Sequence, residues 1–348
     1  MAKIGVDVGG TFTDIILESE KIGGDSGGVM VHKVPSTPED QSIGVIRGIT
    51  EICDKAGVAL GDIEKVVHGT TIATNAVIEY DGAEVGMLTT RGFRDILHLA
   101  RHKRPHNFSM QFDVPWQSKP LVKRRNRIPV SERILPPDGR IEEALNEDDV
   151  RAAAELLKKR GVDAVIICFI YSFLNNTHEQ RAKEIVKEIL PDTYVSCSSE
   201  VADVIREYER FSTAAMNAFI GPRTSFYLRN LESALRAQGV NAEIRVMQSN
   251  GGVTTIEGGS ERPVTILMSG PAGGVIGGKW AGELSGVENL ITVDIGGTSA
   301  DISVVPRGEV RIMNPRDTMV GGYPILSPMI DLATIGAGGG SIAHVDEG

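Results

Sequence analysis

The chain has 348 residues, of which 41% are hydrophobic and 24% are charged, and its formal net charge is −10. This length favours two domains, and the mixture of charged and aliphatic residues excludes an intrinsically disordered protein. Because an acidic surface repels a polyanion, we expect no nucleic-acid partner.

Three scattered cysteines, Cys53, Cys168 and Cys197, lack the CxxC spacing of zinc sites, and their odd number does not suit a disulfide framework. No uninterrupted apolar stretch is long enough to cross a bilayer. The N-terminus begins with a strand pattern rather than with a basic and then apolar leader. We therefore expect a cytoplasmic protein without a membrane partner.

Along the first half of the chain, short β-rich runs surround one long helical pattern. Residues 3–18 predict a β-hairpin around a Gly-Gly turn. Further strands are expected at residues 29–34, 66–68 and 85–89, and a helix is expected at 38–55. Residues 105–140 hold six prolines and predict an irregular excursion from the domain core.

The second half predicts a more regular alternation. Helices are expected at residues 146–160, 177–190, 202–238 (with a break at Gly221-Pro222) and 273–284. Strands are expected at residues 164–171, 193–197, 241–247 and 263–268, followed by a second hairpin at 289–305. Strands that alternate with helices indicate an α/β protein built in layers. The expected domains are residues 1–200 and 201–348.

Two segments that lie far apart in the chain repeat one hairpin sequence. Ile4-Gly-Val-Asp-Val-Gly-Gly-Thr-Phe-Thr-Asp-Ile aligns without a gap with Ile291-Thr-Val-Asp-Ile-Gly-Gly-Thr-Ser-Ala-Asp-Ile. The alignment pairs Asp7 with Asp294, Asp14 with Asp301, and Gly9-Gly10-Thr11 with Gly296-Gly297-Thr298. A repeat that occurs once in each half indicates a duplicated domain rather than a solenoid.

The residue types of this hairpin suit phosphate binding. Gly-Gly turns leave backbone amides open to phosphate oxygens, and the hydroxyls of Thr11, Thr13 and Thr298 add donors. Asp7 and Asp294 can hold Mg²⁺ through water, because Mg²⁺ keeps much of its hydration shell. One copy alone would be an ordinary hairpin turn. Two copies favour an ATP-hydrolysing fold of the actin, Hsp70 and sugar-kinase type, which is ribonuclease H-like, with ATP and Mg²⁺ between two duplicated domains.

A glycine run occupies residues 334–341. Apolar residues bracket it, and its backbone can lie flat against a ligand. We therefore assign the nucleoside part of ATP to Gly336, Gly338, Gly339, Gly340 and Ser341. A flexible linker is the alternative interpretation.

Other motifs are weaker. Residues 273–279 nearly match a Walker A loop, but Trp280 stands where Ser or Thr would bind Mg²⁺. Residues 269–274 are therefore interpreted as a loop that opens a helix. The basic residues at 101–104 and 123–127 are interpreted as solvated surface or a partner contact. His68 ends a strand, where α/β proteins place ligand groups, although a lone histidine is more often structural.

Further motifs stand in order along nearly the whole chain. They are His68-Gly-Thr-Thr-Ile-Ala-Thr-Asn-Ala76, Thr90-Arg-Gly-Phe-Arg-Asp95, Arg206-Glu-Tyr-Glu-Arg210, Met247-Gln-Ser-Asn-Gly-Gly252, Ser269-Gly-Pro-Ala-Gly-Gly274 and Gly336-Ala-Gly-Gly-Gly-Ser341. Together with the two hairpins, they resemble the N-terminal portion of the hydantoinase A/5-oxoprolinase family. That family includes N-methylhydantoinase A-like proteins and is related to acetone carboxylase β subunits.

This resemblance implies ATP-dependent hydrolysis of a cyclic amide, such as a hydantoin, 5-oxoproline or another lactam, through phosphorylation of the amide oxygen. It also implies a B-type partner subunit, and we expect an oligomer. The residues expected on the substrate side are His68, Thr70, Thr71, Asn75, Arg94 and Arg101. Family members usually continue well past the glycine run, so the second domain is expected to be incomplete.

Three alternatives stay open. Relatives in the same family are subunits of ATP-dependent ketone carboxylases, and the nucleotide motifs would serve both reactions. A regulatory nucleotide-binding module would bind ATP without hydrolysis stimulated by a lactam. A sugar kinase would follow from the fold alone, but the family motifs argue against it.

Overall fold

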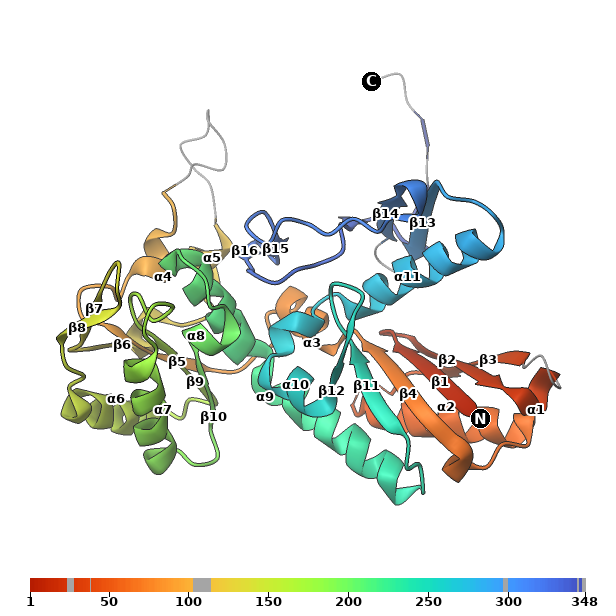
Figure 1. The fold of residues 1–348 in the computed structure, drawn as a ribbon, viewed down its shortest axis with the longest axis horizontal. Helices are drawn as coiled ribbons and strands as arrows, with labels where there is room; N and C mark the ends of the chain where they lie inside the picture. Colours follow the sequence, from red (N-terminus) through yellow and green to blue (C-terminus); the bar gives the residue numbers. More distant parts are fainter. Residues whose placement is uncertain (24–27, 38, 103–113, 297–299, 343, 346–348) are drawn as a thin grey trace.

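The computed structural model describes residues 1–23, 28–37, 39–102, 114–296, 300–342 and 344–345. Figure 1 shows two large β-sheets on either side of a long helix, α9 (Glu207–Ala237), with a smaller sheet above them. α9 packs against strands of one large sheet and against helix α2 (Gln41–Ala56) of the other. This helix therefore joins the two parts of the core. Among the described residues, we find no helix whose length and apolarity would let it cross a membrane.

The first sheet contains the N-terminal hairpin. Its six strands lie in the order β12 (Val253–Thr255), β11 (Glu243–Met247), β4 (Ile63–Thr70), β1 (Ala2–Val8), β2 (Phe12–Ser19) and β3 (Gly28–Pro35). β4 runs parallel to both β1 and β11, whereas β2 pairs with β1 and β3 in the antiparallel sense. Alternate residues of β1 are buried, and α2 covers that face with its own apolar stripe. The sheet and α2 thus enclose one face of the first hairpin.

The second large sheet is entirely parallel. Its strands lie in the order β10 (Tyr194–Cys197), β9 (Ala164–Cys168), β5 (Val85–Thr90) and β6 (Arg127–Val130). Helices α6 (Glu147–Lys159) and α7 (Thr177–Ile189) pack on it, and every residue of β9 is buried. Such continuous burial is typical of a parallel strand that is covered on both faces.

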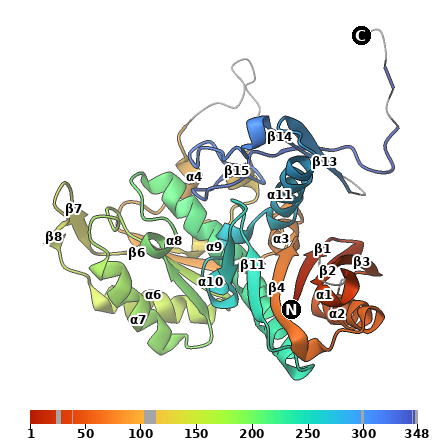
Figure 2. The same cartoon turned by 45° about the vertical axis from the view of Figure 1, so that its right-hand side comes forward.

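The smaller sheet holds the second hairpin. It contains β13 (Leu290–Ile295), β14 (Ala300–Val305) and β17 (Ala333–Ile335) in that order. Helix α11 (Ser269–Leu284) leads into β13 and lies along one side of this hairpin (Figures 1 and 2). The other α-helices and strands are short. They are β7 (Arg133–Leu135), β8 (Arg140–Glu143), β15 (Met319–Val320), β16 (Tyr323–Pro324), α1 (Glu20–Gly23), α3 (Ile72–Ile78), α4 (Ile96–Leu99), α5 (Pro115–Ser118), α8 (Ser198–Val201) and α10 (Ile256–Glu261).

Three expected elements differ in the structure. The strand expected at residues 263–268 is wrong, because Pro263 starts a 3₁₀ helix instead. The break expected at Pro222 is absent, since α9 continues through this residue. The proline-rich excursion contributes strand β6, which tolerates Pro129 because β6 lies at a sheet edge.

The division into domains at residue 200 stays a prediction. β11 and β12 follow residue 200 in the sequence, yet they extend the sheet that contains β1 and β4. Any division of the chain has to accommodate this pairing.

Candidate functional site

The two repeated segments form two β-hairpins with one register. β1 pairs with β2 so that Asp7 lies opposite Asp14, and β13 pairs with β14 so that Asp294 lies opposite Asp301. The two pairs are those that the sequence alignment equates. The repeat in the sequence is therefore also a repeat in the structure.

Asp7 and Asp294 line one cavity of ≈ 410 Å³, although they belong to different hairpins. The start of α11 contributes glycines to the same cavity. A Cβ atom added to Gly270 would lie 3.1 Å from Oδ1 of Asp7, and one added to Gly274 would lie 3.9 Å from Oδ2 of Asp294. The absence of side chains at these positions lets the α11 backbone approach both carboxylates.

The electrostatic environment of Asp7 disfavours its negative charge. Although water reaches the side chain, the surrounding protein atoms of the cleft raise the pKa of this carboxyl by desolvation, which is the largest cause. The carboxylates of Asp294 and Asp14 raise it further, whereas the ammonium of Lys33 lowers it. A cation placed between Asp7 and Asp294 would relieve this repulsion.

The donor set of this cavity suits Mg²⁺. Within the part of the chain that the structure describes, no cluster of three or more His, Cys, Asp or Glu residues could hold a metal. Asp7 and Asp294 would thus provide two carboxylates. This number fits Mg²⁺, which is usually held by one or two carboxylates together with phosphates and water. It does not fit a structural zinc site, which needs four protein ligands.

Helix α11 begins at the cavity, where Ser269 and Gly270 line the wall. The first amides of a helix have no partner within the helix, and they carry a partial positive charge. An anion bound in the cavity would therefore be stabilised by this end of α11. The loop expected at residues 269–274 is wrong, because these residues form the first turns of α11, which starts at Ser269 rather than at 273.

Gly69 is a site residue that the sequence reasoning missed. It lies in β4 directly beside Asp7, and a Cβ atom there would lie 3.1 Å from Oδ1 of Asp7. The carboxylate thus fits between Gly69 on one element and Gly270 on another. The glycine before Thr70 was visible in the sequence, but its contact with Asp7 depends on the pairing of β4 with β1.

The first turn is held by Ser36. Its hydroxyl donates to the carbonyl of Gly9 at 2.8 Å and bonds Oγ1 of Thr13 at 3.0 Å, while its backbone N donates to the carbonyl of Thr11 at 2.9 Å. Thr13 is buried, so its hydroxyl supports the turn from inside. Gly10 is exposed, and a Cβ atom there would meet nothing within 4 Å. The outer side of the turn is therefore open to a ligand.

The glycine run meets the second turn. The backbone N of Gly339 donates to the carbonyl of Gly296 at 2.9 Å, and the N of Gly338 donates to Oγ of Ser341 at 3.0 Å. Gly336 and Gly340 are exposed. The predicted phosphate ligands Gly297 and Thr298 lie outside the described residues. The structure thus brings the predicted nucleoside segment beside the predicted phosphate turn.

Four of the residues expected on the substrate side join β4 and α3 to neighbouring elements. His68 is fully buried, and its Nε2 lies 2.9 Å from the hydroxyl of Tyr227. Burial lowers the pKa of His68 to about 4, which keeps the ring neutral. Oγ1 of Thr71 donates to the carbonyl of Val8 at 3.1 Å and accepts from Nδ2 of Asn75 at 3.4 Å. Thr70 bonds Ser269 through its backbone.

Arg94 and Arg101 lie elsewhere. Arg94 donates to the carbonyl of Arg124 at 2.9 Å, and Nε of Arg101 donates to Oε1 of Glu209 at 2.8 Å. Neither arginine lines the cavity that contains Asp7. Their predicted contact with substrate stays a prediction.

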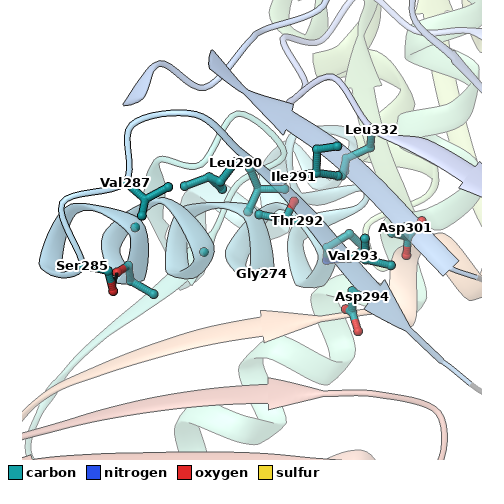
Figure 3. Close-up of a pocket in the computed structure, with 15 residues that line it drawn as sticks. Gly274, Ser285, Val287, Leu290, Ile291, Thr292, Val293, Asp294, Asp301 and Leu332 are labelled. Atoms are coloured by element: carbon teal, nitrogen blue, oxygen red, sulfur yellow. Dashed lines mark hydrogen bonds between the residues drawn. The ribbon is translucent and has the colours of Figure 1, made fainter. Parts of the chain in front are cut away.

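A second cavity of ≈ 630 Å³ adjoins the first and shares Gly274 and Asp294 with it. Figure 3 shows this cavity between α11 and β13, with Asp294 and Asp301 towards one end and Val287 and Leu290 towards the other. Asp294 therefore lies where the two cavities meet.

Two family models match the chain. The model of the hydantoinase/oxoprolinase N-terminal region matches residues 3–190, and that of hydantoinase/oxoprolinase matches residues 210–348. Among curated proteins, the chain is 37% identical to caprolactamase subunit alpha of Pseudomonas jessenii, covering 99% of this chain and 49% of that protein. It is 29% identical to 5-oxoprolinase of Saccharomyces cerevisiae, covering 98% of this chain and 28% of that protein. The chain spans about half the length of several curated relatives that it matches.

Two solved structures share the fold. The crystal structure of the ATP-dependent caprolactamase from Pseudomonas jessenii matches with a TM-score of 0.84 and 36% identity, over 99% of this chain and 49% of that one. The nucleotide-free structure of an acetone carboxylase, from a study of ATP-dependent acetone carboxylation, matches with a TM-score of 0.86 and 27% identity over the same shares. The predicted α/β fold of the actin-like ATPase type is thereby confirmed.

Proposed function

The chain belongs to the hydantoinase/oxoprolinase family, and we propose that it binds Mg-ATP between its two hairpins and uses it to hydrolyse a cyclic amide. The observation that carries this proposal is the position of Asp7 and Asp294 in one cavity, beside the start of α11. Mg-ATP combines a cation with an anion. The two carboxylates would hold the cation, and the N-terminus of α11 would stabilise the phosphates.

Each part of the nucleotide has candidate ligands. Asp7 and Asp294 would hold Mg²⁺, which when bound neutralises charge on the phosphates. The phosphates would contact the turns at Gly9, Gly10, Thr11 and Gly296, with Gly297 and Thr298 as predicted from the sequence. The nucleoside would lie against residues 336–341. Gly339, bonded to Gly296, would connect the nucleoside segment to the phosphate segment.

The reaction follows from the chemistry of amides. An amide carbon is a poor electrophile, and phosphorylation of its oxygen makes it a better one. The amide oxygen attacks the γ-phosphorus of ATP, an O–P bond forms, and the bond to the β,γ-bridging oxygen breaks to release ADP. Water then adds to the activated carbon, the ring C–N bond breaks, and the nitrogen takes up a proton. A second water releases inorganic phosphate and leaves a carboxylate. The protein's main contribution would be to position the reactants and stabilise their charge.

The substrate class rests on the relatives. A caprolactamase and a 5-oxoprolinase, both named for lactam substrates, match nearly the whole chain. The lack of a charged cluster at the apolar part of the cavity, formed by Val31, Val67 and Met247, suits a small lactam ring. Relatives named as subunits support a B-type partner in an oligomer, and we propose a cytoplasmic location.

An ATP-dependent ketone carboxylase subunit is the second candidate. The fold match to acetone carboxylase is as good as the match to caprolactamase, so the fold does not distinguish the two reactions. An enolate oxygen could attack the same γ-phosphorus.

The test is phosphate release from Mg-ATP by the purified chain, alone and with a candidate B-type partner. The panel contains caprolactam, 5-oxoproline, hydantoins, acetone and acetophenone. Release that only lactams or hydantoins stimulate, together with ring opening, is the expected result. Stimulation by ketones in the presence of bicarbonate would favour the carboxylase. ATP binding without stimulation by any compound, with the partner present, would contradict both.

A further inference from the structure

Arg127, the first residue of β6, has a buried guanidinium with one donor left over. The residue is only 1% exposed, and its Nε and Nη2 both donate to the carbonyl of Val122, at 3.0 and 2.8 Å. Its Nη1 is also buried, and it has no acceptor within the part of the chain that the structure describes. Because a buried charged group without a partner is strongly destabilising, Nη1 requires an acceptor.

The surroundings of Arg127 carry an excess of positive charge. The pKa of its guanidinium is lowered to about 10, chiefly by burial; Asp95 opposes this shift, whereas Arg124 and Arg94 add to it. The side chain therefore stays charged at neutral pH. Asp95 is itself bonded by Arg124, whose Nε and Nη2 each donate to it at 2.9 Å. Three guanidinium groups thus lie around one carboxylate, which favours a further anion here.

A small cavity lies beside Arg127. Its volume is ≈ 10 Å³, which is about the room that one water-sized particle needs. Trp116 lines the same cavity, and its indole Nε1 is a second buried donor without an acceptor among the described residues. Tyr208 and Ser212 of α9 also line it, and their hydroxyls can donate. Of the described residues in the lining, Arg127 is the only charged one. The cavity therefore offers donors and a positive charge, but no carboxylate.

Three distant segments meet at this cavity. Its lining comes from residues 97–127, from α9 and from Tyr323 of β16. The hydroxyl of Tyr323 donates to the carbonyl of Lys119. A Cβ atom added to Gly322 would lie 2.6 Å from Cγ of Pro115, so β16 and α5 are in close contact, as Figure 1 also shows. A ligand in the cavity would therefore hold the three segments together.

We propose that this cavity binds one chloride ion, which accepts hydrogen bonds from Nη1 of Arg127 and from Nε1 of Trp116. The donors and the positive charge select an anion, and the size of the cavity selects a monatomic ion over a carboxylate or a phosphate. A water molecule would satisfy both N–H groups but would leave the charge uncompensated. Among the described residues, none lines both this cavity and the one that contains Asp7. The chloride site is thus separate from the proposed nucleotide site.

Thermal unfolding of the full chain in sodium chloride, compared with sodium gluconate at equal ionic strength, measures this binding. Because the ion binds only the folded state, chloride should raise the melting temperature saturably. Trp116→Phe keeps an aromatic ring but removes the donor, so it should increase the half-saturating chloride concentration at least tenfold. Trp280→Phe, at an exposed position of α11, is the matched control and should not change it. Equal melting temperatures of wild type in the two salts, or an unchanged response in Trp116→Phe, would overturn the proposal.

Fluorescence gives a second and more local measurement. Trp116 is the only tryptophan of the Trp280→Phe variant. Bromide is a heavier halide that quenches indole fluorescence on contact, and it serves as the probe. We expect quenching that saturates and that chloride, but not gluconate, relieves by competition. Arg127→Met removes the charge and should abolish the saturable part. Quenching that rises linearly with bromide and does not respond to chloride would indicate random collisions alone and would overturn the proposal.

Discussion

The hydroxyl of Ser269 bonds both backbone polar groups of Thr70. It donates to the carbonyl of Thr70 at 2.9 Å and accepts from its N–H at 3.3 Å. Both residues are fully buried. The end of β4, which lies beside Asp7, is thereby connected to the start of α11, which lies beside both aspartates. One serine thus connects two walls of the candidate nucleotide site.

Ser269→Ala should destabilise the protein, because it leaves the two backbone groups of Thr70 without this partner. The expected loss is about 1–3 kcal/mol in the free energy of unfolding. Chemical denaturation of both proteins measures it. Ser285→Ala is the control, since Ser285 lies exposed at the other end of α11, and it should change stability by less than about 0.5 kcal/mol.

Gly270→Ala should weaken Mg-ATP binding, because its Cβ atom would displace the Asp7 carboxylate from a contact at 3.1 Å. We expect roughly a tenfold increase in Kd, measured by titration calorimetry, which is about 1.4 kcal/mol. Gly277→Ala is the matched control in the same helix, where a Cβ atom meets nothing within 4 Å. Equal affinities in the two variants would contradict the proposed contact between α11 and the nucleotide site.

Asp7→Asn should raise the thermal stability of the free protein at neutral pH. Because the folded state raises the pKa of Asp7 above its ordinary value of 3.8, the neutral form is favoured by folding. Stability from this group is present below pH 3.8 and is lost as the pH rises through the folded pKa. The advantage of Asp7→Asn should therefore be largest at pH 7 and shrink as the pH falls towards 4. Melting curves across this range measure it, and a variant less stable than wild type at pH 7 would argue against the repulsion described here.

The buried ring of His68 predicts an acid-sensitive fold. Its pKa falls from 6.5 to about 4 on folding, so the unfolded chain binds more protons between these values. The contribution of the neutral His68 ring to the free energy of unfolding is fully present above pH 6.5. This contribution is lost as the pH falls towards 4, and the loss is about 3 kcal/mol at most. Denaturation of wild type and His68→Gln at pH 5 and pH 7.5 isolates this contribution. If the free energy of unfolding falls by the same amount from pH 7.5 to pH 5 in both proteins, His68 is not the source of the acid sensitivity.

Both hairpins could be predicted from the sequence because short local patterns specify them. Alternating apolar residues around a Gly-Gly turn specify a hairpin, and the repeat of Asp7 as Asp294 pointed to a shared site before any contact was known. The register of both hairpins bears out the repeat.

Contacts between distant segments of the chain could not be predicted from local sequence patterns. The packing of Asp7 between Gly69 and Gly270 needs the parallel pairing of β1 with β4 and the approach of α11, and neither leaves a local pattern. The addition of β11 to the first sheet is a similar case, since strand order depends on packing across the whole chain. His68 is another case, because its burial and its contact with Tyr227 of α9 leave no local pattern in the sequence, and its role towards a substrate stays a prediction.

If both hairpins form one Mg-ATP site, the affinity for ATP should depend on Mg²⁺ through both Asp7 and Asp294. Titration calorimetry of ATP in the presence and absence of Mg²⁺ tests this with wild type, Asp7→Asn, Asp294→Asn and the double variant. We expect each single substitution to remove most of the Mg²⁺-dependent gain in affinity, and the double variant to lose little more, because both carboxylates hold one cation. Normal Mg²⁺-dependent binding in either single variant, with the fold intact by circular dichroism, would show that the two hairpins do not share one Mg-ATP site.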